Sequence, residues 1–173
     1  DIRADVLLLE TTRGATPTPE HFSRQSVSDQ LIKAITAGFE NGGGVLVPVF
    51  ALGRTQEILG SIALAMQAGD LKRQPVYIGG LGRVFTEIYD LVGPSAPNLR
   101  PDLILHEALD LRVLEARELD RLSLKGKLFV ITAGMMSEHT LAHELALRMA
   151  PEKSHSILFV GYAAPDTPAG AMR

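Results

Sequence analysis

Cysteine is absent from this chain of 173 residues. Without cysteine, these residues can form neither a disulfide nor a thiolate-bound zinc site. No apolar run approaches the roughly 20 residues that a helix needs to cross a bilayer. The first five residues also lack the charged-then-apolar pattern of a secretory leader. We therefore expect a protein without a membrane partner, and a cytoplasmic location.

Net positive charge is absent as well, because 17 Lys and Arg face 20 Asp and Glu and the formal charge is −3. This excludes binding of nucleic acid through an overall basic surface. It leaves open a local site in which a few arginines and helix ends contact phosphates. Four arginines near predicted loops are candidates, although for each one alone a solvated surface residue is the favoured interpretation: Arg13, Arg24, Arg54 and Arg83.

The length predicts one domain, and a composition with 46% apolar and 21% charged residues is typical of a globular protein with a real core. The sequence does not begin with methionine, and its last residues follow directly on a motif. We therefore expect a single domain over residues 1–173 that is a segment of a longer protein.

Short apolar runs alternate with stretches of helical periodicity along the chain. The apolar runs predict strands at 6–9, 45–49, 75–78, 103–105, 127–132 and 157–160. The periodic stretches predict helices at 26–39, 55–67, 81–91, 111–122 and 137–149. This alternation predicts an α/β fold with a doubly wound, mostly parallel sheet and helices on both faces.

Ligands of such sheets bind beyond the carboxyl ends of the strands. The loops that follow predicted strands should therefore share one edge: 10–14, 50–54, 79–83, 134–137 and 161–167. In the second of these loops, a strand runs into a turn that opens a helix with Arg54 in its first turn. Helix N-termini carry partial positive charge, and arginine adds a planar fork for phosphate oxygens. An ordinary junction with a surface arginine is the alternative.

Four segments carry a family resemblance: residues 5–14, 48–57, 130–136 and 158–168. The second reads Pro-Val-Phe-Ala-Leu-Gly-Arg-Thr-Gln-Glu and resembles the Pro-x-Phe-Ala-x-Gly-Arg-x-Gln-Glu signature of the β-CASP domain. That domain is the cassette inserted in nucleic-acid-processing members of the metallo-β-lactamase superfamily, such as ribonuclease J. The other three segments resemble the family's strand ending in Glu-Ser-Thr-Tyr-Gly, its Gly-Met strand end and its Gly-Tyr…Gly-Thr.

The resemblance implies that the parent protein is a metal-dependent nuclease with two zinc ions that hydrolyses phosphodiester bonds in RNA, or in DNA. This chain would form one wall of the substrate cleft, facing the adjoining metallo-β-lactamase domain, and would hold no metal itself. Glu10 would support the active-site network. Substrate contacts would come from Arg13, Gly53, Arg54, Gly134, Met135 and Thr167. A homo-oligomer is a further expectation.

Two positions depart from the family pattern. Arg13 stands where the family usually has tyrosine, which exchanges a stacking ring for a cation. Ala171 stands at or near a family histidine that is proposed as a proton donor, and alanine cannot donate a proton. A catalytically inactive scaffold or partner-binding subunit is therefore an alternative function. A Rossmann-like module that binds a small molecule is the second alternative.

The histidines offer a weaker possibility. His139 and His143 are four residues apart on the predicted helix 137–149, a spacing that could hold a metal. The glutamate of a His-Glu-x-x-His protease is missing, so a solvated helix face is favoured. His21, His106 and His155 are isolated, and we interpret them as surface or structural residues.

Overall fold

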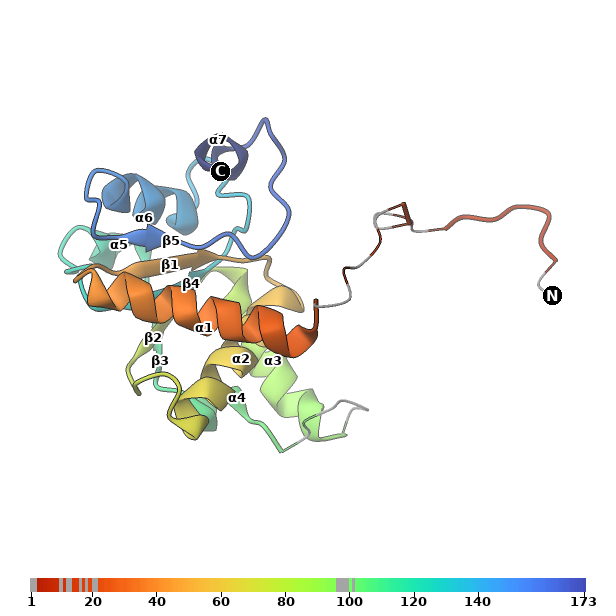
Figure 1. The fold of residues 1–173 in the computed structure, drawn as a ribbon, viewed down its shortest axis with the longest axis horizontal. Helices are drawn as coiled ribbons and strands as arrows, with labels where there is room; N and C mark the ends of the chain where they lie inside the picture. The colour runs from red at the N-terminus through yellow and green to blue at the C-terminus, as the bar shows by residue number, and fades with distance from the viewer. Residues whose placement is uncertain are drawn as a thin grey trace.

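The computed structural model describes residues 3–9, 11, 14–15, 17, 19, 22–95, 100 and 102–173. From residue 22 onward the chain forms a sheet between two layers of helices (Figure 1). The first elements in chain order are α1 (Arg24–Glu40), β1 (Val45–Pro48), α2 (Arg54–Ala68), β2 (Val76–Gly79), α3 (Leu81–Val92) and the 3-10 turn η1 (Gly93–Ser95). They are followed by α4 (Leu105–Ala108), β3 (Leu111–Val113), α5 (Ala116–Leu119), β4 (Leu128–Ile131), α6 (Leu141–Met149), β5 (Ser156–Ile157) and α7 (Pro168–Met172).

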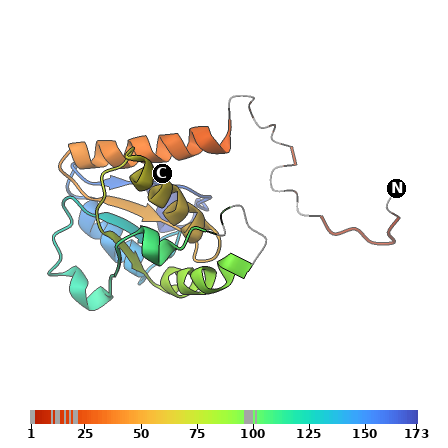
Figure 2. The same cartoon turned by 90° about the horizontal axis from the view of Figure 1, so that it is seen from below.

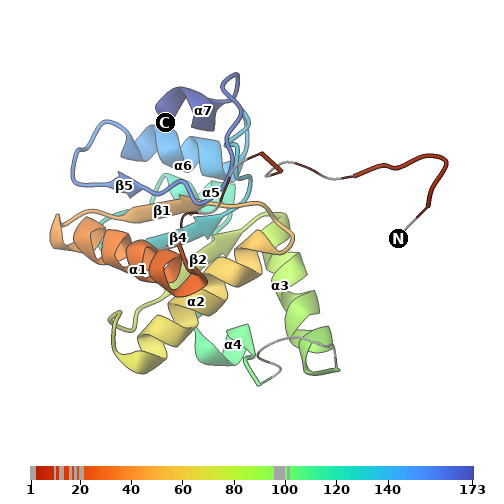
Figure 3. The ribbon, with the colours of Figure 1, turned by 45° about the vertical axis from the view of Figure 1, so that its right-hand side comes forward.

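The sheet contains five strands in the order β3-β2-β4-β1-β5, and all pairs are parallel. The path moves across the sheet from β1 to β3 and then returns to β4 and β5. Right-handed crossovers in opposite directions place their helices on opposite faces. Accordingly, α1 to α4 lie on one side of the sheet, and α5 to α7 lie on the other (Figures 1 and 3). The predicted doubly wound α/β fold is confirmed.

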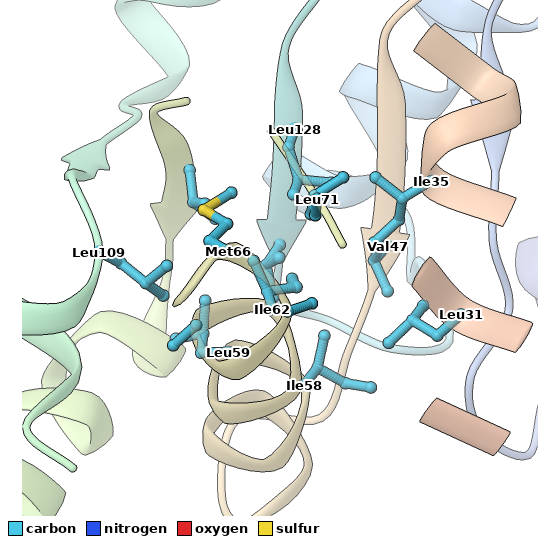
Figure 4. Packing of buried hydrophobic residues seen from close by; sticks show 14 of the residues in the cluster. Leu31, Ile35, Val47, Ile58, Leu59, Ile62, Met66, Leu71, Leu109 and Leu128 are labelled. Carbon is cyan, nitrogen blue, oxygen red and sulfur yellow. The ribbon is translucent and has the colours of Figure 1, made fainter. Parts of the chain in front are cut away.

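The central strands are apolar throughout because both of their faces are covered. Every residue of β1 and β4 is buried, which explains why neither strand alternates with polar residues. On one face, Ile35, Val47 and Ile62 pack together from α1, β1 and α2 (Figure 4). On the other face, Phe129 and Leu145 belong to the second cluster, which joins β4 to α6. Full burial of each such side chain stabilises the fold by roughly 1.5–3 kcal/mol.

Helix α1 begins where local hydrogen bonding predicts a start. Ser23 accepts a hydrogen bond from the backbone N–H of Ser26, and the Ser26 hydroxyl accepts one from the N–H of Ser23. This reciprocal capping gives hydrogen-bond partners to backbone N–H groups that have none within the first turn of the helix. At the other end, Asn41 is the C-cap and Gly42 follows with a φ of 73°, a conformation that glycine adopts readily at the end of a helix.

The predicted strand 6–9 is wrong. Val6, Leu7, Leu8 and Leu9 are 70% to 93% exposed and form no strand, and the N-terminal segment extends away from the domain (Figures 1 and 2). A buried strand needs neighbours on both sides, and within the described part of the chain the five-stranded sheet already ends at β3 and β5. The apolar run alone could not reveal that its neighbours are missing here.

The region 103–122 was also mispredicted. Residues 103–105 are not a strand, because Leu105 begins the short helix α4. Residues 111–122 are not one helix, because Leu111–Val113 forms the edge strand β3, and only Ala116–Leu119 is helical. Strand β3 is partly exposed and carries Arg112 between two apolar residues. An apolar–polar–apolar pattern of this length does not differ from the spacing of a helix.

Candidate functional site at the carboxyl edge of the sheet

The turn between β1 and α2 is held by its own side chains. Gly53 has a φ of 78°, a conformation that favours glycine, and its N–H donates to Oε1 of Gln56 at 2.8 Å. The Gln56 amide in turn donates to the carbonyl of Ala51 at 3.3 Å and to Oγ1 of Thr86 on α3 at 3.1 Å. Gln56 is 94% buried, so these partners replace water. The Gly-Arg-x-Gln pattern is therefore a device that fixes this turn.

Few backbone donors remain free at this turn. The N–H of Arg54 donates to the carbonyl of Leu52, and the N–H of Thr55 donates to the carbonyl of Phe50. The N–H of Gly53 is occupied by Gln56. A phosphate at this junction would therefore meet the guanidinium of Arg54 rather than the N–H groups of Gly53, Arg54 and Thr55.

The guanidinium of Arg54 is partly exposed and paired. Its Nη1 lies 2.5 Å from Oε2 of Glu57, and Nη2 of Arg24 lies 3.1 Å from Oε1 of the same carboxylate. Arg24 and Arg54, predicted separately as loop cations, thus meet across the start of α1 and the start of α2. Glu57, the acidic residue between them, was not predicted as part of the site. It is the last residue of the family signature and follows Arg54 by three positions.

The β4–α6 loop meets the β1–α2 loop at Phe50. Gly134 lies so close to it that a Cβ atom on the glycine would be 3.0 Å from the backbone nitrogen of Phe50 and 3.1 Å from the carbonyl carbon of Val49. Gly161, from the loop after β5, reaches the same ring, since a Cβ there would lie 3.5 Å from Cε2 of Phe50. Three strand-end loops therefore converge on one aromatic residue.

Met135 and Thr167 lie where these loops join α7. The carbonyl of Met135 accepts a hydrogen bond from the N–H of Ala169 at 3.2 Å. The hydroxyl of Thr167 donates to the carbonyl of Ala164 at 2.6 Å and accepts from the N–H of Gly170 at 3.2 Å. The hydroxyl therefore already caps α7. Ala171 lies on this helix and is exposed, so the position of the missing histidine borders the same edge.

The loop after β2 completes the edge. Gly80 has a φ of 64°, and a Cβ atom there would lie 2.4 Å from Oγ1 of Thr132. That hydroxyl donates to the carbonyl of Gly79 at 3.1 Å, which links the residue after β4 to the last residue of β2. Next to this contact lies a shallow depression of about 580 Å³, whose lining includes Gly80, Arg83 and Glu115. The predicted grouping at one edge is thus confirmed for the loops 50–54, 79–83, 134–137 and 161–167, whereas the loop 10–14 includes residues outside those that the structure describes.

Two exposed aromatic side chains at this edge had no role assigned from the sequence. Phe50 is 39% exposed and Tyr162 is 67% exposed, and a Cβ atom on the glycine that precedes Tyr162 would lie 3.5 Å from the Phe50 ring. Aromatic rings that face solvent beside a cation can stack on nucleic-acid bases. Tyr162 directly follows Gly161, and Phe50 precedes Gly53 by three positions, so their place in glycine-containing loops after strands could have identified them.

Other candidate residues are not brought into this group. Glu10 and Arg13 lie outside the residues that the structure describes. His139 precedes α6, which begins at Leu141 with Thr140 as its N-cap, so it does not share a helix face with His143 as predicted. Across the described ranges, no group of three or more His, Cys, Asp and Glu side chains could hold a metal ion. No helix there is long and apolar enough to cross a membrane.

Two of the isolated histidines have structural partners, as interpreted from the sequence. His155 is 3% exposed, and its Nδ1 accepts the N–H of Gly44 at 2.8 Å. His106 lies with Nδ1 at 2.6 Å from the Asp90 carboxylate. Both lie away from the carboxyl edge. His21 is outside the described residues.

Comparison with known proteins gives a consistent family. The model of the Beta-Casp domain matches residues 55–172. An RNase J-like protein of Methanocaldococcus jannaschii is 30% identical over 167 residues, which cover 94% of this chain and 38% of the relative. Endoribonuclease ysh1 of Schizosaccharomyces pombe is 30% identical over 169 residues, covering 95% of this chain and 22% of the relative. Transcription termination factor FttA of Lokiarchaeum sp. is 28% identical over 173 residues, covering 95% and 27%. This chain therefore spans less than two-fifths of each of these relatives.

Proposed function

The chain belongs to the Beta-Casp domain family, and on that premise we propose that it forms the RNA-binding wall of a metal-dependent ribonuclease. It would be one domain of a longer protein, as its partial coverage of relatives such as the RNase J-like protein supports. The wall is the carboxyl edge described above. A cytoplasmic location belongs to the same proposal, because the chain has no cysteine and the proposed substrate is RNA.

The convergence of three strand-end loops on Phe50 carries this proposal. It brings the guanidinium of Arg54, the Gly134–Met135 loop and the loop up to Thr167 to one edge of a rigid sheet. A cation and exposed aromatic rings on such an edge match the chemistry of single-stranded RNA, in which phosphates alternate with unstacked bases. Arg54 would contact a phosphate, and Arg13 and the backbone at Gly53, Gly134 and Met135 would border the strand. Thr167 would act through its cap of α7.

Catalysis would require the adjoining metallo-β-lactamase domain. We propose that two zinc ions are held there, as the resemblance to metallo-β-lactamase nucleases implies. Such ions would activate a water molecule and stabilise charge on the phosphate. Glu10 would support that network from this chain, as the family resemblance implies.

Ala171 favours a second candidate function. A domain that lacks the family histidine on α7 could bind RNA, or a partner protein, without cutting. A small-molecule-binding module is a weaker candidate, because the depression beside Gly80 is shallow and is lined by surface residues of α3, β3 and α5.

The test uses the full-length protein and a single-stranded RNA labelled at one end. We expect metal-dependent cleavage, which a chelator abolishes and added Zn²⁺ restores. RNA binding without cleavage under all metal conditions would favour the inactive scaffold. Failure to bind RNA, together with a nucleotide retained through purification, would favour the small-molecule module and overturn the proposal.

A further inference from the structure

Helix α3 is attached to the domain by its small and polar side. Gly82 and Thr86 are buried, and the Thr86 hydroxyl donates to the carbonyl of Gly82 at 2.8 Å while accepting from Gln56 of α2. One turn later, the carboxylate of Asp90 accepts the N–H groups of Leu105 and His106 at 2.8 and 2.9 Å and so caps α4. These three residues are spaced by four, so they form one face of α3. That face is turned toward the protein.

The opposite side of α3 is apolar and faces solvent. Its residues belong to neither buried cluster, and their exposed fractions are large: Leu81 64%, Val84 38%, Ile88 45%, Leu91 83% and Val92 47%. In Figure 2, α3 (green) runs along the outer margin of the domain, on the side opposite to α1 (orange). An amphipathic helix normally turns its apolar stripe toward the core. Here the orientation is reversed, and a contiguous exposed apolar stripe marks an interaction surface.

The spacing of the stripe matches a helix–helix seam. Leu81, Val84, Ile88 and Leu91 follow one another at intervals of three, four and three residues, which is the a/d pattern of helices that pack side by side. The order Leu-Val-Ile-Leu is nearly the same when read backwards. Two antiparallel copies would therefore set leucine against leucine at both ends and valine against isoleucine in the middle.

The charges beside the seam fit the same arrangement. Glu87 flanks the stripe and pairs with Arg83 one turn earlier, with Nη1 and Oε1 2.9 Å apart. A second helix running in the opposite direction presents the two charges in reverse order, so each arginine approaches the glutamate of the other copy. Two charges of opposite sign, spaced by four, make this flank self-complementary.

We propose that the outward stripe of α3, made of Leu81, Val84, Ile88, Leu91 and Val92, is the interface through which two copies of the protein associate about a twofold axis. A twofold interface uses the same patch on both subunits, as this stripe does. The inference is independent of the proposed function.

The adjoining domain of the same chain is a less suitable occupant. Helix α3 starts at the carboxyl edge, where Gly80 contacts Thr132, and runs away from that edge for 12 residues, or about 18 Å at 1.5 Å per residue. Figure 3 shows its far end at the periphery of the domain, beyond α2. A domain that faces the edge would lie near Leu81, whereas the most exposed residue, Leu91, lies at the far end.

The first experiment measures the molar mass of the full-length protein by light scattering after gel filtration, from about 1 to about 100 µM, because association depends on concentration. We expect a dimer for the unmodified protein and a monomer for Ile88→Glu/Leu91→Glu. The matched control is Leu147→Glu on α6, a leucine that is 53% exposed on the other side of the sheet, and it should stay dimeric. Circular dichroism of each variant checks that the fold is kept.

The second experiment tests the antiparallel register. Arg83→Glu alone and Glu87→Arg alone should each shift the protein toward monomer, because each places like charges on both flanks. An equimolar mixture of the two variants should recover the dimer, since the flanks become complementary again.

Three results would overturn the inference: a monomeric unmodified protein over the whole range, a dimer that survives Ile88→Glu/Leu91→Glu, or a mixture that does not reassociate. If the unmodified protein is a monomer and Ile88→Glu/Leu91→Glu unfolds it, the stripe packs against another part of the same chain. RNA cleavage is measured in parallel. Its presence or absence decides the proposed function without affecting the oligomeric state.

Discussion

Gly134 lies so close to Phe50 that a Cβ atom on the glycine would be 3.0 Å from the backbone nitrogen of Phe50 and 3.1 Å from Cδ2 of its ring. The contact joins the loop after β4 to the loop after β1, and Gly161 adds the loop after β5. A pair of glycines around one ring therefore fixes the relative position of three loops.

Replacement of Gly134 by alanine tests this contact. The added Cβ would meet the backbone at Phe50 and Val49, at 3.0 and 3.1 Å, rather than the end of a flexible side chain. We expect a loss of about 1–3 kcal/mol in the free energy of unfolding, as for other overpacked sites, measured by urea denaturation. Gly60→Ala, inside α2 with its nearest contact at 3.7 Å, is the control and should instead stabilise by about 0.5–1 kcal/mol. Equal stability of the two variants would refute the close approach.

Glu57→Gln should strengthen RNA binding. The substitution removes the negative charge that Arg24 and Arg54 share. A single charge at the surface changes affinity by about threefold at low salt, and less at high salt. Stability should change by no more than about 0.5 kcal/mol, since the ion pairs are exposed.

The control for this prediction lies at the opposite edge of the sheet. Glu152 pairs with Lys125 at 3.4 Å, in the turns that lead into β5 and β4. Glu152→Gln removes the same charge, and fluorescence-anisotropy titrations should find its RNA affinity unchanged. If both variants gained affinity equally, net charge rather than the Arg54 site would be responsible.

Tyr162→Ala should weaken the binding of single-stranded RNA, because the exposed ring is lost as a stacking surface. Stacking on one base contributes roughly 1–3 kcal/mol, which corresponds to about fivefold to 150-fold in affinity. Tyr162→Phe keeps the ring and should bind normally. Double-stranded RNA, whose bases are already stacked, should distinguish little between the variants. A loss in Tyr162→Phe equal to that in Tyr162→Ala would assign the effect to the hydroxyl group instead.

The sequence predicted the sheet well where burial on two faces leaves an unmistakable pattern, as in Val45–Pro48 and Leu128–Ile131. It failed at the edge strand Leu111–Val113, because a half-exposed strand of this length has no periodicity that differs from a helix. It failed for Val6–Leu9, since apolar character alone does not supply a neighbouring strand.

The site could be predicted in outline only. The rule that parallel strands end at one edge grouped Arg54, Gly134 and Thr167 correctly, because that rule depends on topology alone. The sharing of Glu57 by two arginines depends on how α1 crosses α2, and the use of backbone N–H groups at Gly53 depends on the rotamer of Gln56. Neither follows from residue spacing.

The most direct test of the account is the salt dependence of RNA affinity for Arg54→Ala in the full-length protein. Arg73→Ala is its control, because Arg73 is exposed between α2 and β2, at the amino ends of the strands. Loss of one phosphate contact should lower the slope of log affinity against log salt concentration by about 0.7 for a single strand. We predict this change for Arg54→Ala alone, together with weaker binding. An unchanged affinity and slope in Arg54→Ala, or equal changes in both variants, would contradict the assignment of the carboxyl edge as the RNA-binding surface.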